Sequence, residues 1–234
     1  MKDKSASQDV NRFWCVENFS LVEVLDRQEQ EALHRYMRFV DYRAGETIYF
    51  PGDPSDTVYS LHRGRVRLGY LNENGRRLTF AILGRGQVFG ETALAGEETR
   101  HWIAEALEDS TLCMIFKGDL LRFAEGNPKL ALRISKLVGE RLVEIENKLQ
   151  DLIFKGVPAR LSQTLLELAE RYGEREAEGV RIRFKITHRE LAQLIGSTRE
   201  TTSAALGRME RQGLLSKRYG VIVLKNLDRL KEAS

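Results

Sequence analysis

The residues with the clearest chemical use lie near the C-terminus, where two helix starts flank a glycine. Thr187 precedes Glu190 by three residues, which is the spacing of a capping box at a helix N-terminus. Gly196 then permits a tight turn, and either Ser197 or Thr198 can cap a second helix. A short helix, a glycine turn and a longer helix are the element order of a helix–turn–helix, which places its second helix in the major groove of DNA.

The first turn of that second helix, which we expect to run to about residues 212–213, carries side chains suited to base edges. The guanidinium of Arg199 can donate two hydrogen bonds to O6 and N7 of guanine. The carboxylate of Glu200 can accept one from the N4 amine of cytosine. Each good contact of this kind discriminates between bases by about 1–3 kcal/mol. A phosphate contact is the alternative role for Arg199.

The identity of the helix cap decides what Glu200 can do. If Thr198 is the cap, which we favour, the Glu200 side chain is free to point at DNA. If Ser197 is the cap, Glu200 falls at the capping-box position and stabilises the helix end instead. Ser203, one turn further along the helix, is a third position that can read the groove in either case.

Residues 217–220, Lys-Arg-Tyr-Gly, precede a predicted strand at residues 221–224. A basic hairpin at this place is typical of a wing that touches the DNA backbone, and a solvated hairpin tip is the alternative. The residues predicted to contact DNA are Thr187, Ser197, Thr198, Arg199, Glu200, Thr201, Ser203, Lys217 and Arg218.

The distribution of charge supports a nucleic-acid partner for the C-terminal third. From residue 159 onward, 15 Lys and Arg stand against 10 Asp and Glu, whereas the preceding part holds the other 22 basic and 24 acidic residues. The net charge of +3 therefore divides into +5 and −2. A basic domain joined to a nearly neutral one is the balance expected when only one of the two binds DNA.

Several classes of protein are excluded by what the sequence lacks. No stretch approaches the roughly 20 apolar residues that span a bilayer, and residues 1–11 lack the apolar core of a secretory signal, so we expect no membrane partner and a cytoplasmic protein. The two cysteines and four histidines show no metal-ligand spacing. No nucleophile–base pair or phosphate-binding loop is present, so we expect neither catalytic residues nor enzyme activity.

Between residues 39 and 116 the sequence indicates short antiparallel strands. Apolar segments are separated by turn signals such as Asn74-Gly75, the strongest hairpin cue in the chain. Strands this short and this frequent predict a small barrel or jelly roll, whose interior either holds a ligand or is filled by side chains. The predicted strands are residues 47–50, 58–61, 66–70, 78–83 and 111–115.

A long helix follows, and it carries a heptad seam. Asn127 and Pro128 suit a helix cap and first position, and the helix is expected to run to about Phe154. Apolar residues recur along it at alternating steps of four and three, and charged residues lie beside them. This pattern favours a parallel helix pair between two subunits over packing of the helix on its own domain. The residues of this predicted dimer interface are Val138, Leu142, Ile145, Leu149 and Leu152.

Residues 156–158, Gly-Val-Pro, break the long helix and begin a last domain with its own core. This domain is expected to contain a helix with a Leu161, Leu165, Leu168 stripe, a charged loop at residues 173–179 and a strand at 180–186. The sequence thus predicts an α+β protein: an antiparallel β-roll sensor at 1–126, a dimerisation helix at 127–155 and a winged helix-turn-helix at 156–234.

The chain resembles the cyclic AMP receptor protein / fumarate–nitrate reductase regulator superfamily of transcription regulators, from about residue 19 to residue 224. The resemblance rests on FPGD at 50–53, LHRGRV at 61–66, VFGE at 88–91, NP at 127–128, RLSQTLL at 160–166 and GSTRET at 196–201. It implies a β-roll sensor, a parallel two-helix dimer and twin recognition helices. The twin helices would bind double-stranded DNA, in half-sites about 34 Å apart on a palindrome. RNA polymerase would be a further partner of the protein.

The resemblance also implies an effector pocket for a small anion such as a cyclic nucleotide. Gly90, Glu91 and Arg100 match the part of the family's pocket that holds ribose and phosphate. The family's serine after that arginine is His101 here, and the Thr–Ser pair that contacts the base falls at Ile145 and Glu146. The implied pocket consists of Gly90, Glu91, Thr92, Arg100, His101, Ile145 and Glu146.

Because the base-contacting half of that pocket is replaced, we expect no strong switching by cyclic AMP. Activity without a ligand and binding of another anion near Arg100 are both open, and His101 is either part of an altered pocket or a histidine with a satisfied hydrogen bond beside Trp102. Ala204 stands where the family has a further base-reading arginine. The expected half-site is therefore related to TGTGA and relaxed at one base pair. Activation of transcription, as opposed to repression, is expected from the resemblance to the family alone.

Overall fold

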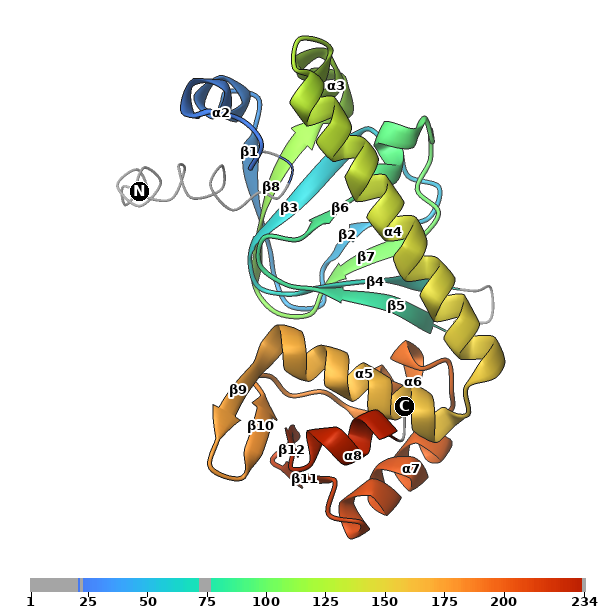
Figure 1. Ribbon diagram of the computed structural model, residues 1–234. Coiled ribbons are helices and arrows are strands. Elements are labelled where there is room, and N and C mark those ends of the chain that lie inside the picture. Colours follow the sequence, from blue (N-terminus) through green and yellow to red (C-terminus); the bar gives the residue numbers. More distant parts are fainter. Residues whose placement is uncertain (1–20, 22, 72–76, 233–234) are drawn as a thin grey trace, which may run out of the picture. The chain divides into compact units, whose positions relative to one another are not determined.

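Two antiparallel four-stranded sheets form the N-terminal part of the molecule (Figure 1). The computed structural model describes residues 21, 23–71 and 77–232. In the first sheet the strand order is β1 (Arg38–Tyr42), β8 (Ser110–Phe116), β3 (Thr57–Arg63) and β6 (Val88–Phe89). In the second it is β2 (Thr47–Tyr49), β7 (Ile103–Ala106), β4 (Val66–Leu71) and β5 (Arg77–Leu83). The predicted β-roll is therefore confirmed.

All five predicted strands are present, and three more were not predicted. Strand β7 has the sequence Ile-Ala-Glu-Ala, whose alanines and glutamate favour helices, so its strand conformation comes from pairing with β4 and β2. Strand β6 has only two residues, and β1 begins with a charged residue. The Asn74-Gly75 turn lies outside the described residues, so the hairpin cue stays a prediction.

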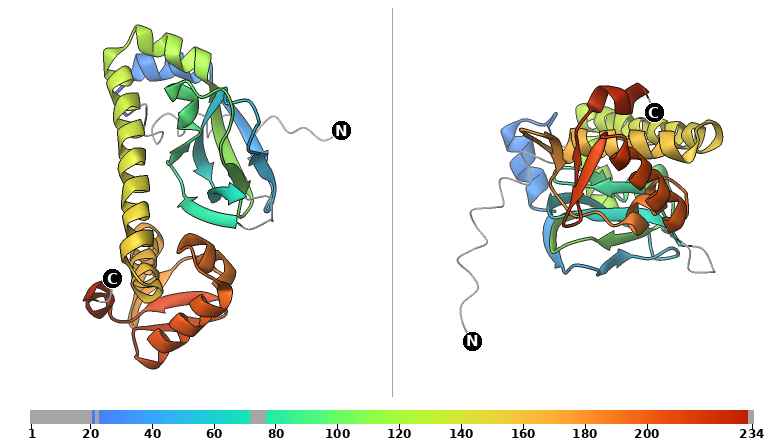
Figure 2. Two further views of the ribbon diagram at one scale, coloured as in Figure 1. Left: turned by 90° about the vertical axis from the view of Figure 1, so that its right-hand side faces the viewer. Right: turned by 90° about the horizontal axis from the view of Figure 1, so that it is seen from below.

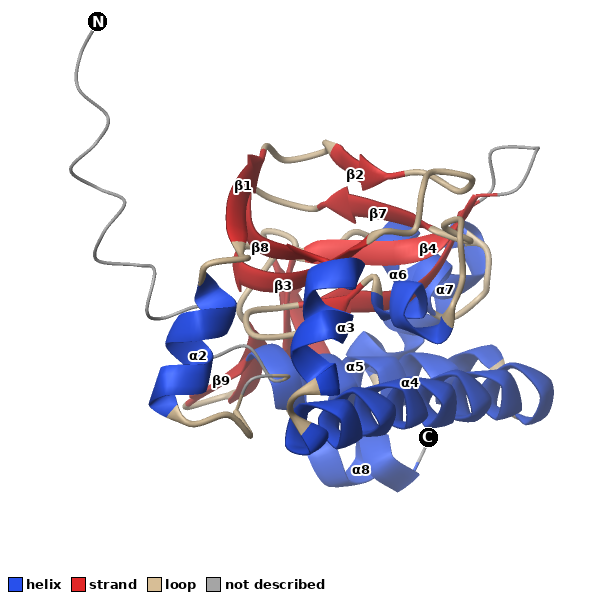
Figure 3. Cartoon of the chain, turned by 90° about the horizontal axis from the view of Figure 1, so that it is seen from above, coloured by secondary structure: helices blue, strands red, loops and turns tan. Residues whose placement is uncertain are grey.

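Three helices cover the first sheet and complete its core. The helix α2 (Arg27–His34), the helix α3 (Lys117–Glu125) and the start of α4 (Pro128–Phe154) lie on one side of the strands (Figure 3). Their apolar side chains pack with those of β3, β6 and β8 in one cluster, because a sheet with an apolar face must bury it against other elements. The buried members include Leu33, Val58, Val88, Ile115, Leu120, Leu130 and Ile134.

The long helix α4 begins where the sequence predicted, and its cap ties it to α2. Asn127 Oδ1 accepts a hydrogen bond from the backbone N–H of Leu130 at 3.1 Å, and Asn127 Nδ2 donates to Glu29 Oε1 at 2.6 Å. The helix continues to Phe154 without a break. The chain divides into two compact units, residues 1–72 with 81–144 and residues 73–80 with 145–234, so α4 contributes to both.

One side of α4 is apolar and uncovered within this chain. Leu142 and Leu149 are each 56% exposed and Ile145 is 43% exposed, whereas the other two predicted seam residues, Val138 and Leu152, are half-buried. These leucine and isoleucine side chains leave apolar surface in contact with water. Burying that surface would be favourable by about 25 cal/mol per Å².

The C-terminal unit is a winged helix built on one antiparallel sheet. Its helices are α5 (Val157–Tyr172), α6 (His188–Leu194), α7 (Arg199–Arg211) and α8 (Leu227–Glu232). Its strand order is β11 (Leu215–Arg218), β12 (Val221–Leu224), β10 (Gly179–Ile182) and β9 (Gly173–Glu176). Figure 2 shows α7 and the β11–β12 hairpin from two further directions. Leu161, Leu165 and Leu168 of α5 are buried as the apolar stripe predicted.

Two expectations for this unit were wrong in detail. The charged loop predicted at 173–179 is a hairpin, in which β9 pairs with β10 and Arg181 forms an ion pair with Glu174 at 2.7 Å. Strand β9 is largely exposed and carries no apolar side chain, so no apolar alternation marked it in the sequence. The strand predicted at 180–186 ends at Ile182. No helix in the part of the chain that the structure describes is long and apolar enough to cross a membrane.

The Asn127 cap generates a stability prediction. Replacing Asn127 by Ala removes one helix cap and the bond to Glu29, and we expect it to lower the free energy of unfolding by about 1–2 kcal/mol. Urea unfolding followed by tryptophan fluorescence measures this change, because both tryptophans, Trp14 and Trp102, belong to the N-terminal half. The matched control is Lys129→Ala at an exposed position of the same turn, which should change the stability by less than about 0.5 kcal/mol. Equal stability of the two variants would contradict the prediction.

Candidate nucleic-acid interface and effector pocket

The two helices predicted from the C-terminal motif are both present and both capped. The Glu190 backbone N–H donates to Thr187 Oγ1 at 3.2 Å, and Glu190 Oε2 accepts from the Thr187 backbone N–H at 2.7 Å. This reciprocal pair is the capping box that begins α6. Gly196 has a φ of +60°, which an L side chain rarely adopts, so the tight turn to α7 requires a glycine.

Thr198 is the cap of α7, which settles the alternative left open by the sequence. Its Oγ1 accepts the backbone N–H of Thr201 at 3.1 Å. Glu200 is consequently not a capping residue, and its exposed carboxylate makes no hydrogen bond or ion pair with the described residues. Arg199 beside it is also exposed and makes neither kind of contact with them.

The α7 helix has one buried face and one solvent face. Thr202, Ala205, Leu206 and Met209 are buried against the rest of the unit, so they fix the orientation of the helix. The predicted base-reading residues Arg199 and Glu200 lie on the exposed part of its first turn, with Ala204 one turn further along. A helix held by one face and offering unpaired polar groups on the other has the geometry of a recognition helix.

Behind this solvent face, a histidine holds the third predicted reading residue. His188 Nδ1 and Ser203 Oγ are 2.7 Å apart, which joins the first residue of α6 to α7. Burial lowers the pKa of His188, and the charges of Lys217 and Arg199 lower it further, while Glu210 acts in the opposite direction. His188 was not among the predicted contacts, because its partner lies 15 residues away and only the helix–turn–helix fold brings the two together.

The wing separates its two predicted basic residues. Lys217 donates to Glu210 of α7 through Nζ at 3.1 Å, and this hydrogen bond lowers the pKa of the Glu210 carboxyl. Arg218 is exposed, and Tyr219 at the tip is 94% exposed with a φ of +53°. The hairpin therefore presents Arg218 and Tyr219 outward, while the charge of Lys217 is largely compensated within the protein.

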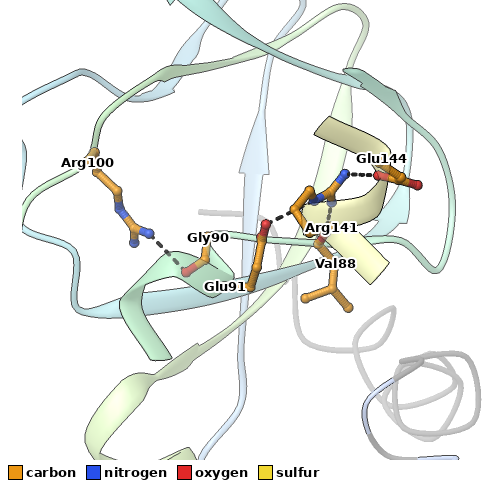
Figure 4. Close-up of polar contacts among 6 residues, drawn as sticks. All are labelled: Val88, Gly90, Glu91, Arg100, Arg141 and Glu144. Carbon is orange, nitrogen blue, oxygen red and sulfur yellow. Dashed lines mark hydrogen bonds and ion pairs between the residues drawn. The ribbon is translucent and has the colours of Figure 1, made fainter. Parts of the chain in front are cut away.

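In the N-terminal unit, the predicted phosphate-binding arginine is buried, and both of its Nη atoms donate hydrogen bonds within the protein. Arg100 is 3% exposed. Its Nη1 donates to Gly90 O at 3.2 Å, and its Nη2 donates to Thr57 O at 2.6 Å and Thr57 Oγ1 at 2.9 Å (Figure 4 draws the Gly90 contact). A Cβ on Gly90 would lie 2.9 Å from Thr57 O and 3.0 Å from Arg100 Nη1, so this close packing requires a glycine.

Aromatic rings fill the interior of the roll next to Arg100. The rings of Tyr59 and Phe89 stack with centroids 5.0 Å apart, and the guanidinium carbon of Arg100 lies 4.5 Å from the centroid of Tyr49. Cation–π contact with a buried ring stabilises a guanidinium that has no carboxylate partner. Burial raises the pKa of the Tyr49 hydroxyl, so this tyrosine is neutral at any physiological pH.

The second predicted pocket residue, Glu91, connects the roll to the long helix. Its carboxylate is 3% exposed and accepts a hydrogen bond from Arg141 Nε at 3.0 Å. Arg141 also donates to Val88 O at 3.2 Å and pairs with Glu144 at 2.6 Å (Figure 4). This pairing was not predicted, since no sequence signal links Arg141 to a residue 50 positions earlier.

The remaining predicted pocket residues lie outside this network. Thr92 is half-buried in the short 3-10 helix η1 (Glu91–Ala95). His101 is exposed and pairs with Glu97 at 2.9 Å. Ile145 and Glu146 are exposed residues of α4 that belong to the second compact unit. Among residues 21, 23–71 and 77–232, no group of three His, Cys, Asp or Glu is placed to hold a metal ion.

Comparison with known proteins agrees with both halves of the molecule. Residues 39–127 match the model of the cyclic nucleotide-binding domain, and residues 159–233 match that of the Crp-like helix-turn-helix domain. The transcriptional regulator SdrP of Thermus thermophilus is 34% identical, with 82% of this chain and 92% of that protein covered. The cyclic AMP receptor protein of the same organism is 32% identical, with 82% and 85% covered.

A solved structure extends the likeness to the whole fold. A CRP/FNR-family transcriptional regulator from Thermus thermophilus has a TM-score of 0.71 and 33% identity, with 84% of this chain and 97% of that chain covered. A β-roll, a long helix and a winged helix-turn-helix define a DNA-binding transcription regulator. The chain belongs to the CRP/FNR family. Neither matching family model describes an enzyme.

The Glu91–Arg141 ion pair is predicted to stabilise the packing of α4 on the β-roll. Arg141→Met leaves the Glu91 carboxylate buried without its partner, which we expect to lower the stability by about 3 kcal/mol. The double variant with Glu91→Gln should recover most of the loss, because no charge is then left buried. Thermal unfolding of the single and double variants measures the difference. A double variant as unstable as the single one would show that the ion pair is not the cause.

Proposed function

We propose that this protein is a homodimeric transcription activator of the cytoplasm, binding a palindrome of TGTGA-related half-sites and holding its DNA-binding state without cyclic AMP. The observation that carries the proposal is that both Nη atoms of Arg100 already donate hydrogen bonds, to Gly90 and Thr57, while its guanidinium lies against the Tyr49 ring. A cyclic nucleotide phosphate would have to displace bonds that the protein already makes.

The base contacts follow from the exposed first turn of α7. Arg199 and Glu200 carry the functional groups that distinguish guanine and cytosine in the major groove, and neither has a competing partner among the described residues. Ala204 offers only a methyl group at the position where the family has an arginine, so one base pair of each half-site is read less strictly. Arg218 and the helix caps Thr187 and Thr198 lie at the edges of this face and suit backbone phosphates.

A second copy of the chain is the occupant that suits the uncovered side of α4. Leu142, Ile145 and Leu149 follow the heptad spacing of a parallel helix pair, and all three are exposed in one chain. Pairing of two α4 helices would bury this stripe and set two α7 helices about a dyad. Half-sites one helical turn apart would then match the symmetry of the dimer.

A different anionic effector near Arg100 is the second candidate mode of control. It is favoured by one observation: the Nε atom of Arg100, a donor, is buried without a hydrogen-bond partner among the described residues. The Oε2 atom of Glu91 is likewise without a partner among them and would accept from a hydroxyl group of the effector, not from its charged group. The match to regulator families supports a function without catalytic activity. Contact with RNA polymerase is proposed from the family, and the β9–β10 hairpin is the segment that lies in the family's contact position.

The effector proposal is tested by fluorescence anisotropy of dialysed protein on a labelled palindrome of TGTGA-like half-sites. We expect the dissociation constant to change less than about threefold when cyclic AMP is added, because Arg100 is not available to the phosphate. The same titration with a scrambled palindrome measures non-specific binding. Binding that begins only after cyclic AMP is added would refute the ligand-independent proposal and leave the DNA-binding function intact.

The dimer is tested by placing a charge in the α4 stripe. Leu149→Glu removes one apolar side chain from each of the two paired helices. Because each side chain contributes about 2 kcal/mol to the free energy of association, the dimer dissociation constant should rise about 1000-fold. Sedimentation velocity measures the change. Gln150→Glu adds the same charge at the neighbouring exposed position outside the seam and should leave the dimer intact. Equal effects of the two substitutions would contradict the proposed interface.

A further inference from the structure

The hydroxyl group of Ser203 is already hydrogen-bonded within the protein, to a histidine. The His188 Nδ1 and Ser203 Oγ atoms lie 2.7 Å apart, which is within hydrogen-bond distance. Ser203 is half-buried on α7, one turn after Arg199. A hydroxyl has one proton to donate, and its direction is set by the partner that claims it. The state of the imidazole therefore decides what the Ser203 oxygen can offer to a base.

We infer that His188 is a positioning residue of the DNA interface that sets whether Ser203 accepts or donates a hydrogen bond in the major groove. This inference rests on the proposed DNA-binding function. With the proton of the neutral imidazole on Nε2, Nδ1 accepts the Ser203 O–H. The Ser203 oxygen can then only accept, which suits the amino groups of adenine N6 and cytosine N4.

The opposite polarity follows when the imidazole gains a proton. Both ring nitrogens of an imidazolium are donors, so Nδ1–H donates to Ser203 Oγ and the hydroxyl proton becomes available to DNA. That proton can be donated to guanine O6 or N7, or to thymine O4. The base preferred opposite Ser203 therefore changes with the charge of His188, while the contacts of Arg199 and Glu200 stay the same.

The charged groups around His188 set the direction of the pH dependence. Lys217 of β11 and Arg199 of α7 oppose its protonation, and Glu210 of α7 favours it. Burial also lowers its pKa, so the neutral form dominates in the free protein near pH 7. DNA phosphates add negative charge nearby, which raises the pKa of His188 in the complex. Protonation and DNA binding then favour each other, and affinity rises as the pH falls through that pKa.

The experiment compares base preference at two pH values with the full-length protein. A palindrome selected from a randomised pool at about pH 8 is substituted one base pair at a time, and each duplex is titrated by anisotropy at about pH 8 and about pH 5.5. For the wild-type chain we expect one base pair in each half-site to change its preference about fivefold towards guanine or thymine at the lower pH. The other base pairs should keep their relative preferences.

Two variants identify the responsible groups. His188→Asn keeps an amide near the Nδ1 position and cannot titrate, so the preference at that base pair should be the same at both pH values. Ser203→Ala should lose the preference at that base pair at both pH values, while the relative preferences at the other base pairs stay as in the wild type; it keeps the test decisive if the histidine variant fails to fold. A wild-type preference that does not change with pH would overturn the role of His188 alone. Failure to select any DNA would overturn the proposed function as well.

Discussion

The ion pair between the buried carboxylate of Glu91 and Arg141 is the interaction on which the sensor unit depends most. A charge removed from water costs several kcal/mol unless it is paired, so the 3-10 helix that carries Glu91 can only sit where Arg141 meets it. Arg141 lies on α4, and its further bond to Val88 O fixes that helix against strand β6, while its ion pair with Glu144 of the same helix holds the guanidinium in place. The position of the long helix on the roll is thereby set by one ion pair as much as by apolar packing.

The interior of the roll beside Arg100 is packed with polar atoms and aromatic rings of the chain itself. The Nη atoms of Arg100 donate to carbonyl and hydroxyl oxygens, and its guanidinium lies against the Tyr49 ring, which offers it an electron-rich surface. The rings of Tyr59 and Phe89 stack beside it.

In the DNA-binding unit, one face of α7 packs into the core, and its exposed face carries the residues predicted to contact DNA. Leu206 and Met209 anchor the helix, whereas Arg199 and Glu200 have no partner among the described residues. Glu210 compensates the charge of Lys217 in the wing. His188 stands between the two faces, since its ring is partly buried while the Ser203 group that it binds lies beside the reading residues.

The sequence by itself determined the elements whose signals are local. The capping box of Thr187 with Glu190, the turn at Gly196, the cap at Asn127 and the longer β-roll strands each depend on residues a few positions apart, and all were predicted. Ala-rich β7 and the exposed hairpin strand β9 were missed, because pairing with neighbouring strands overrides their weak or misleading local preference.

Only the tertiary structure decided the partners of the charged and polar groups. Arg100 meets Thr57 across 43 residues, Arg141 meets Glu91 across 50, and His188 meets Ser203 across 15. No sequence period links positions so far apart. The long-range packing that brings them together also takes them partly or wholly out of water, and this is the physical reason that each group needs hydrogen-bond partners within the protein.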